Sequence, residues 1–192
     1  MWYTQHPAQS SHSLQLTRRA QQAQQGYLAD IAQHCSYALT LHTTLKTFGR
    51  SQQNLLDDFE TTRHCLHQLR VRSNRALTGN GWQRNPRYLP IFVPVIEGTV
   101  NTYDRNRTLH IHLAVGNLPE RYTEKDLLGI YRGSWLSTPC AADDVRLVPL
   151  WSNEKAGWGH YMTKEERQGR TDSVDYYNTQ IPKHILATLQ AA

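Results

Sequence analysis

Apolar side chains recur along this chain at two spacings, one typical of helices and one typical of strands. Residues 52–76 carry apolar positions every three or four residues, which predicts a long helix that stops at Gly79-Asn80-Gly81. Residues 123–135 keep the same spacing and predict a second helix. The Gln- and Ala-rich stretch 14–33 predicts an amphipathic helix, which follows a polar, mobile arm at residues 1–13.

Shorter stretches rich in strand-forming residues separate the helices. The expected strands are residues 37–43, 88–100, 108–118 and 145–150. Pro90 and Pro94 indicate that the second of them is irregular or lies at a sheet edge. A polar turn at 101–107 separates it from the third strand, so these two strands are expected to form an antiparallel hairpin. A further helix is expected at 157–167, and the tail from residue 171 shows no clear pattern.

The order of these elements predicts an α+β fold with a mostly antiparallel sheet. Strand, helix, strand, strand, helix, strand is the split βαβ arrangement, of the ferredoxin or RRM type, with the helices on one face of the sheet. The chain of 192 residues fits one domain, which we place at residues 35–192 after an N-terminal arm and helix at 1–34.

Charge and cysteine content narrow the class of protein. The net charge of +5 and the pI of about 9.2 favour a polyanionic partner without requiring one. Cys35, Cys65 and Cys140 lie far apart and outside any CxxC spacing, which predicts reduced thiols rather than a disulfide framework. No apolar run approaches the ~20 residues of a membrane span, and the N-terminus has no signal-peptide pattern. We therefore expect a cytoplasmic protein without membrane contact.

The stretch 108–118 contains two histidines that can share a metal ion. His110 and His112 project from the same face of a strand, whereas Ile111 points to the other face. Glu97 ends the neighbouring strand of the expected hairpin and is the best third ligand. Two imidazoles and a carboxylate suit Mn²⁺, Mg²⁺ or another first-row divalent ion. The alternative is a satisfied core histidine beside a second histidine at a strand end.

Tyr161 and Lys164 form a second candidate group, three residues apart on an expected helix and hence on one face. A phenol has an ordinary pKa near ~10 and attacks poorly unless a metal ion or a cation stabilises its developing charge. Lys164 can orient a phosphate or stabilise the phenolate. The alternative is an aromatic residue at the core edge beside a solvated lysine.

Basic and aromatic side chains near the expected strands suit single-stranded nucleic acid. Phosphates pair with cations while bases stack on rings. The candidate DNA-binding residues are Arg84, Arg87, Arg105, Arg107 and Trp158, with Trp82 and Tyr88 as further stacking positions. A solvated arginine rim and ordinary core tryptophans would give the same pattern.

Together these motifs resemble the HUH endonuclease superfamily, specifically the single-tyrosine replication initiators of plasmids, filamentous phages and related mobile elements. The strand at 37–40 is similar to the first motif of that family, His110-Ile111-His112 to the second, and Tyr161 with Lys164 to the third. The stretch 94–113 and the acidic-aromatic segment 172–179 resemble the compact replication proteins of inovirus-related elements.

The resemblance implies metal-dependent, site-specific nicking and rejoining of single-stranded DNA at an origin hairpin, which initiates rolling-circle replication. A divalent ion on His110, His112 and Glu97, Mn²⁺ or Mg²⁺, would polarise the scissile phosphate. Tyr161 would attack it, leaving a 5′-phosphotyrosine and a free 3′-hydroxyl. The sequence contains no GxxxxGK[ST] P-loop, so a host helicase and a host polymerase are expected partners.

Three alternatives remain open at this point. Tyr176 or Tyr177 is a possible nucleophile in place of Tyr161, because Lys183 follows them. A catalytically silent regulator of the same fold would bind an origin or a promoter without cutting it. A metal-free phosphoesterase with two facing His-x-Thr/Ser motifs would use residues 42–44, but the His110 stretch does not supply its second motif.

Overall fold

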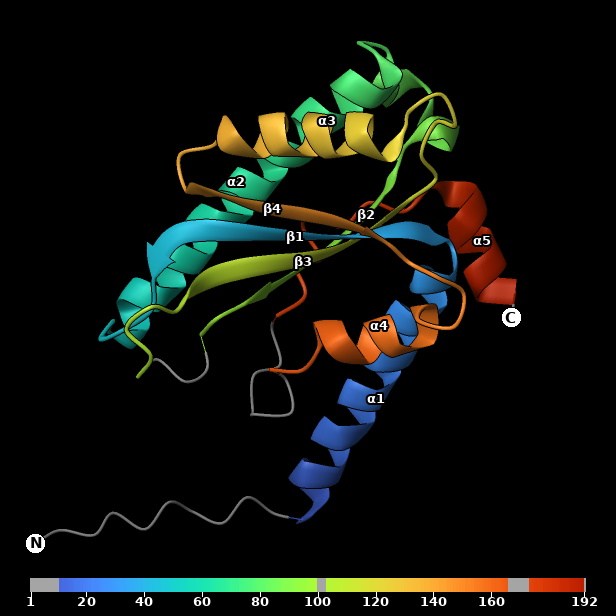
Figure 1. Cartoon of the computed structure of the whole chain (residues 1–192). Helices are drawn as coiled ribbons and strands as arrows, with labels where there is room; N and C mark the ends of the chain where they lie inside the picture. The colour runs from blue at the N-terminus through green and yellow to red at the C-terminus, as the bar shows by residue number, and fades with distance from the viewer. Residues whose placement is uncertain (1–10, 100–102, 166–172, 192) are drawn as a thin grey trace, which may run out of the picture.

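A single antiparallel sheet organises the chain (Figure 1). The computed structural model describes residues 11–99, 103–165 and 173–191. The strands are β1 Cys35–Lys46, β2 Ile91–Glu97, β3 Thr108–Gly116 and β4 Ala141–Pro149, hydrogen-bonded in the order β2-β3-β1-β4. In this order β3 lies between β1 and β2, and β1 lies between β3 and β4. Every neighbouring pair is antiparallel. These interleaved connections confirm the α+β fold with a split βαβ arrangement.

Helices connect and flank the strands. They are α1 Ser11–Gln33, α2 Gln52–Thr78, α3 Glu124–Leu136, α4 Lys155–Met162 and α5 Lys183–Ala191, with the short 3₁₀ turns η1 Trp82–Arg84 and η2 Pro86–Tyr88. The predicted helices at 52–76 and 123–135 are confirmed. Thr123 caps α3 through a capping box with Asp126, which explains why that helix begins where the sequence indicates.

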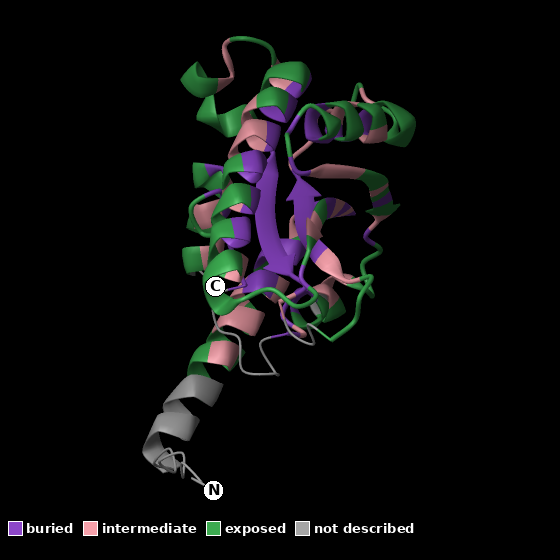
Figure 2. Ribbon diagram, turned by 90° about the vertical axis from the view of Figure 1, so that its left-hand side faces the viewer, coloured by how far each residue is buried: buried purple, intermediate pink, exposed green. Residues whose placement is uncertain are grey.

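The helices cover both faces of the sheet, so the prediction that they lie on one face is wrong. Helices α2 and α3 cover one face, where Leu39, Leu66 and Trp135 share a core. Helices α1 and α4 cover part of the other face, where Leu28 and Met162 join a second core (Figure 1). The physical reason is that β2 and β3 are buried along nearly their whole length, so both faces of the sheet need a covering layer (Figure 2).

Helix α1 belongs with the sheet rather than forming a separate arm. Leu28 and Ile31 are fully buried in the core that α1 shares with α4. The helix begins at Ser11, three residues earlier than expected. The rest of the expected arm, residues 1–10, lies outside the described residues.

The C-terminal part of the chain completes the edge of the sheet. β2 carries Pro94 at the edge of the ladder, as its prolines predicted. Residues 173–180 run along its outer side, where Ile96 N–H donates to Ser173 O and Phe92 exchanges hydrogen bonds with Gln180. The sequence did not predict this segment or α5.

Helix α4 is shorter than expected. It ends at Met162, and Thr163 is its C-cap. Lys164 therefore lies in the turn after the helix, where its N–H donates to Tyr161 O at 3.3 Å. This turn keeps Lys164 near Tyr161 although the two residues do not share a helix. None of the described helices has the length and hydropathy of a membrane span.

Candidate active site

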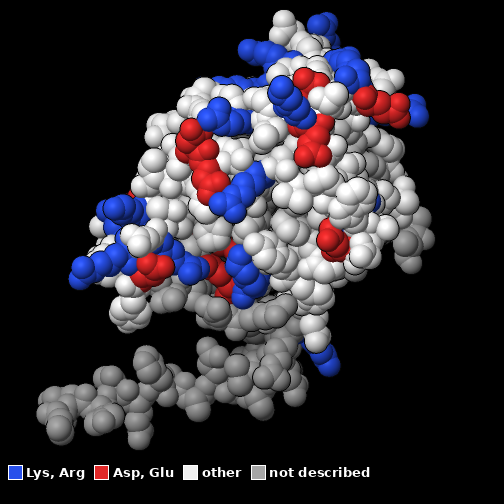
Figure 3. All heavy atoms as spheres, in the orientation of Figure 1, with Lys and Arg blue, Asp and Glu red and all other residues white. Residues whose placement is uncertain are grey.

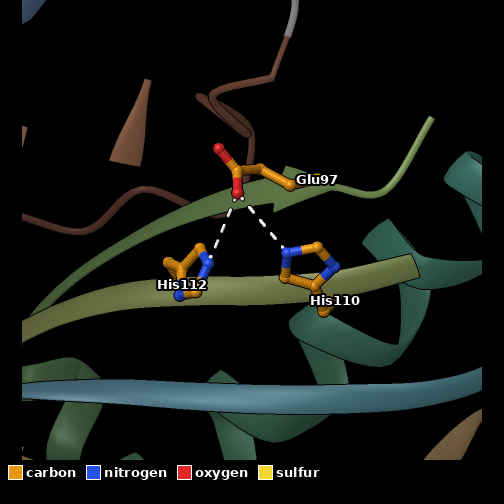
Figure 4. A group of neighbouring side chains, drawn as sticks. All are labelled: Glu97, His110 and His112. Carbon is orange, nitrogen blue, oxygen red and sulfur yellow. Dashed lines mark ion pairs between the residues drawn. The ribbon is translucent and has the colours of Figure 1, made fainter. Parts of the chain in front are cut away.

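Glu97, His110 and His112 come together on the β2–β3 hairpin (Figure 4). The strand register pairs Glu97 with His110, and His112 lies two residues further along the same face of β3. Glu97 Oε2 lies 3.4 Å from His110 Nε2 and 3.3 Å from His112 Nε2. One ligand atom from each residue lies within 4.8 Å of the others, so this group could hold a metal ion.

The Glu97 side chain is fully buried and nevertheless charged. Burial by itself raises the pKa of a carboxyl group. Here hydrogen bonds from both histidines and from Lys164 outweigh burial and lower the pKa of Glu97 to about 2. The carboxylate is therefore ionised at neutral pH, which is the form that binds a metal ion.

The Lys164 ammonium lies beside the ligand atoms. Its Nζ is 2.7 Å from Glu97 Oε2 and 3.2 Å from His112 Nε2. Glu97 Oε1 is buried and has no hydrogen-bond partner among the described residues. The ligand atoms of Glu97 and His112 thus lie around the Lys164 ammonium, and Oε1 of Glu97 is left without a partner among the described residues. A divalent ion bound there would replace contacts that Lys164 now makes.

His112 is oriented from β1. Thr40 Oγ1 lies 3.2 Å from His112 Nδ1, which leaves Nε2 directed at Glu97. Burial lowers the pKa of His112 despite the opposing effect of the Glu97 carboxylate. A lowered pKa favours the neutral imidazole, which is the form that coordinates metal ions.

His42 joins the cluster from β1, although the sequence pattern did not mark it as a ligand. The register pairs His42 with His110, and their rings stack with centroids 5.7 Å apart. Burial lowers the pKa of His42, and Asp144 on β4 partly offsets this effect. The signal was available, because strand alternation places Thr40 and His42 on one face of β1.

Tyr161 lies at the open side of this cluster. Its side chain is 45% exposed. Its ring lies 4.9 Å from the ring of His112 and stacks on that of Trp158. The Lys164 ammonium is 4.4 Å from the centroid of the tyrosine ring. An accessible phenol, an ammonium group and the candidate metal ligands thus adjoin one another.

A glycine lets α4 carry Tyr161 to this place. A Cβ on Gly159 would lie 2.8 Å from the backbone nitrogen of Ala29 and 2.9 Å from Gln25 O, both in α1. Only glycine therefore allows the two helices to approach this closely. Lys155 adds a hydrogen bond from its Nζ to Gln33 O at the end of α1.

Glu165, which no sequence pattern predicted, connects the turn after α4 to the hairpin. The side chain is 2% exposed and forms an ion pair with Arg107, just before β3. Both of its carboxylate oxygens accept from the backbone N–H of Gly98, at 3.0 and 2.9 Å. Gly98 directly follows Glu97, so Glu165 fixes Lys164 relative to the candidate ligands. An acidic residue after a lysine gave no signal of burial.

The arginines predicted to bind DNA have different surroundings. Arg107 is paired with Glu165 and holds the hairpin in place. Arg105 lies in the same connection, with its guanidinium 5.6 Å from the centroid of the Phe48 ring. Arg84 and Arg87 precede the start of β2, whereas Glu97 ends it. A strand of this length spans about 20 Å, so the structure does not bring Arg84 and Arg87 to the ligand group.

The charged surface is mixed rather than uniformly basic. On the face seen in Figure 3, acidic side chains lie among the lysines and arginines. Arg132 pairs with Asp143, and Arg146 pairs with Asp144. The net positive charge is therefore not concentrated over β4, and recognition of a polyanion there needs more than charge.

Tyr177 lies away from the ligand group. It is 75% exposed, and its ring centroid is 6.3 Å from that of His67 in α2. Helix α2 covers the face of the sheet opposite the histidines, so Tyr177 cannot approach them without rearrangement. Tyr176 adjoins it in the segment paired with β2 and is 59% exposed. The geometry favours Tyr161 over this pair.

Comparisons of the chain with protein-family models, with curated proteins and with solved structures find no match. The residues and the geometry of the site therefore carry the functional conclusion by themselves.

Proposed function

We propose that this protein nicks and rejoins single-stranded DNA, with Tyr161 as the nucleophile. The observation that carries the proposal is an accessible phenol beside an ammonium group and a buried cluster of two histidines and a carboxylate. This combination fits phosphoryl transfer, in which a weak oxygen nucleophile needs positive charge near the scissile phosphate. It is also the set of motifs that resembles HUH replication initiators.

His110, His112 and Glu97 would hold a divalent ion, for which we propose Mn²⁺ or Mg²⁺. When bound, the ion would supply Lewis-acid polarisation of a phosphate oxygen. The buried, unpaired Oε1 of Glu97 and the neutral His112 fit such an ion. Thr40 and Glu165 keep the surrounding groups in position.

The reaction forms one phosphorus–oxygen bond and breaks another. The Tyr161 oxygen attacks phosphorus, and the bond from phosphorus to the 3′ oxygen of the preceding nucleotide breaks. The phenol loses its proton to water, and the departing oxygen gains one, leaving a free 3′-hydroxyl. Lys164 stabilises the charge on the phenol oxygen and the phosphate. Because one phosphoester replaces another, the reverse attack by a 3′-hydroxyl rejoins the strand without a nucleotide cofactor.

The exposed surface of β4 and of the turn after it suits an unpaired strand. Val148 on β4 is 53% exposed, and Trp151 in the following turn is 64% exposed. Arg146 lies two residues before Val148 and is also exposed, and a phosphate bound there would replace its ion pair with Asp144. Exposed apolar and aromatic side chains beside a cation can take bases and phosphates respectively. We propose an origin hairpin as the natural DNA, opened by a host helicase and extended by a host polymerase in rolling-circle replication.

One observation favours a second candidate, a regulator that binds DNA without cutting it. The ion pair of Lys164 with Oε2 already supplies the buried Glu97 carboxylate with a positive charge from the chain itself. A protein that keeps this pair closed would retain the fold and the DNA surface but would not nick.

Incubation with a random library of single-stranded DNA and Mn²⁺ or Mg²⁺ tests the proposal. We expect a covalent protein–DNA adduct, located on Tyr161 by mass spectrometry, that requires the metal ion. Tyr161→Phe should abolish it, whereas the matched variants Tyr176→Phe and Tyr177→Phe should not. DNA binding without any adduct would support the regulator. Cleavage at full rate in excess chelator would contradict the proposed role of the metal ion.

A further inference from the structure

A pocket is lined by Tyr161 and by residues of β1 and β4. It has a volume of about 420 Å³ and lies between the β1–β4 half of the sheet and α4. Ala38 and Val148 contribute apolar surface from the strands, and Trp158 and Tyr161 contribute rings from α4. Its volume lies within the range of about 300–1,000 Å³ that is usual for small-molecule sites.

The pocket is continuous with the site of the proposed chemistry. Thr40 lines it and also contacts His112 through its hydroxyl, at 3.2 Å. Tyr161 lines it as well, with its ring 4.9 Å from the ring of His112. An occupant of the pocket would therefore lie directly beside a phosphate that Tyr161 attacks.

The walls favour a planar aromatic occupant. The rings of Trp158 and Tyr161 are stacked on each other, 22° from parallel, and so present an ordered aromatic wall. The indole N–H of Trp158 is buried and has no acceptor in the part of the chain that the structure describes. A nucleobase offers both a flat face for stacking and polar ring atoms.

Glu154 is the charged residue among those that line the pocket. Glu154 lines the pocket and is exposed, and its Oε2 accepts from Trp151 N–H at 3.4 Å. A carboxylate only accepts hydrogen bonds and repels phosphate, so it favours the base of a nucleotide over its backbone. Guanine offers two adjacent donors, its N1–H and its 2-amino group. Thymine instead places carbonyl oxygens on both sides of its single N–H.

We propose that this pocket binds the base of a nucleotide adjoining the scissile phosphate and prefers guanine through Glu154. The position relative to the phosphate rests on the proposed nicking function, whereas binding of the base does not. Glu154 is then a specificity-determining residue, and the bases next to the nick are read by the same helix that carries the nucleophile.

Titration with free nucleotides tests the pocket without any cleavage. The full chain, labelled with ¹⁵N and free of metal, is titrated with dGMP and separately with TMP, and the Trp158 indole resonance is followed by NMR. A Trp158→Phe sample assigns that resonance. We expect dGMP to shift it and to bind at least about fivefold more tightly than TMP. Glu154→Gln should remove this preference, while Glu120→Gln, an exposed acid outside the pocket, should keep it.

The outcomes separate the pocket from the nicking function. No shift of the indole resonance, or equal affinity for both nucleotides in the unmodified protein, would overturn the proposed base preference. A guanine preference that depends on Glu154 in a protein that never forms an adduct would support the pocket and reject its place beside a scissile phosphate. Where adducts form, sequencing should show guanine enriched at one position next to the nick, and Glu154→Gln should remove the enrichment.

Discussion

The ionised Glu97 makes the metal-free protein sensitive to acid. Its pKa falls from 4.5 to about 2 on folding, which corresponds to about 3 kcal/mol of stability. A lowered carboxyl pKa stabilises the fold above the unfolded value, and this contribution is lost as the pH falls from 4.5 towards 2. We expect the free energy of unfolding of Glu97→Gln, measured with urea, to depend less on pH in this window. Equal slopes for Glu97→Gln and the unmodified chain would contradict the assignment.

Lys164 has two opposing effects, since its ammonium stabilises the Glu97 carboxylate and would compete with a metal ion for it. We expect Lys164→Met to bind Mn²⁺ about tenfold more tightly, a difference of about 1.4 kcal/mol. The same variant should nick DNA more slowly, because the charge beside Tyr161 is lost. Isothermal titration calorimetry and adduct formation measure the two effects. Lys125→Met, an exposed lysine of α3, should change neither.

The ion pair of Glu165 with Arg107 is expected to stabilise the fold. Removing one partner of a buried pair leaves the other charge uncompensated, so Arg107→Ala should lower the free energy of unfolding by about 3 kcal/mol. The exposed neighbour Arg105→Ala should stay within about 0.5 kcal/mol of the unmodified chain. Urea unfolding distinguishes the two. If Arg107→Ala loses as little stability as Arg105→Ala, the Glu165 carboxylate does not need the charge of Arg107.

At the scale of elements, the contact between α1 and α4 leaves no space for a side chain at Gly159. Gly159→Ala places a methyl group against the backbone of α1, so we expect a loss of about 1–3 kcal/mol in stability. Gly157, in the same helix, has open space at its Cβ position. Gly157→Ala should therefore be neutral or stabilising by up to about 1 kcal/mol, because alanine favours a helix. Thermal unfolding of the two variants tests the contact, and equal melting temperatures would exclude it.

Local patterns predicted the elements that depend on local chemistry. The histidine strand, its hairpin with β2 and the start of α3 follow from alternation, a polar turn and a capping threonine. The early end of α4 was missed because its C-cap is Thr163, which lacks the signal that a glycine gives. Residues 173–180 were missed because their order comes from pairing with β2, which no local pattern encodes.

The candidate site was only partly predictable for a related reason. Glu97 could be placed beside His110 because a hairpin connects them. His42 and Glu165 reach the same place from a non-consecutive strand and from the turn after α4. Charge alone also gave no means of distinguishing Arg107, which pairs with Glu165, from an arginine free to bind DNA.

At the scale of the whole molecule, the candidate ligand group joins two strands of the hairpin, so an ion bound there would stabilise the entire fold. At a Mn²⁺ concentration 100 times its dissociation constant, the gain is about 2.7 kcal/mol. For a chain of this size we expect the midpoint of thermal unfolding to rise by about 5–10 °C. His110→Ala should abolish the rise, and His184→Ala in α5 should preserve it. A rise that persists in His110→Ala would place the ion elsewhere.

The pairing of residues 173–180 with β2 also determines when the site can form during protein synthesis. β2 carries Glu97, and its outer side stays uncovered until this late segment leaves the ribosome. Tyr161, Lys164 and Glu165 also emerge after the whole sheet has been synthesised. A nascent chain therefore holds its histidines long before it holds a complete site, which would restrict the proposed DNA cutting to chains synthesised beyond Glu165.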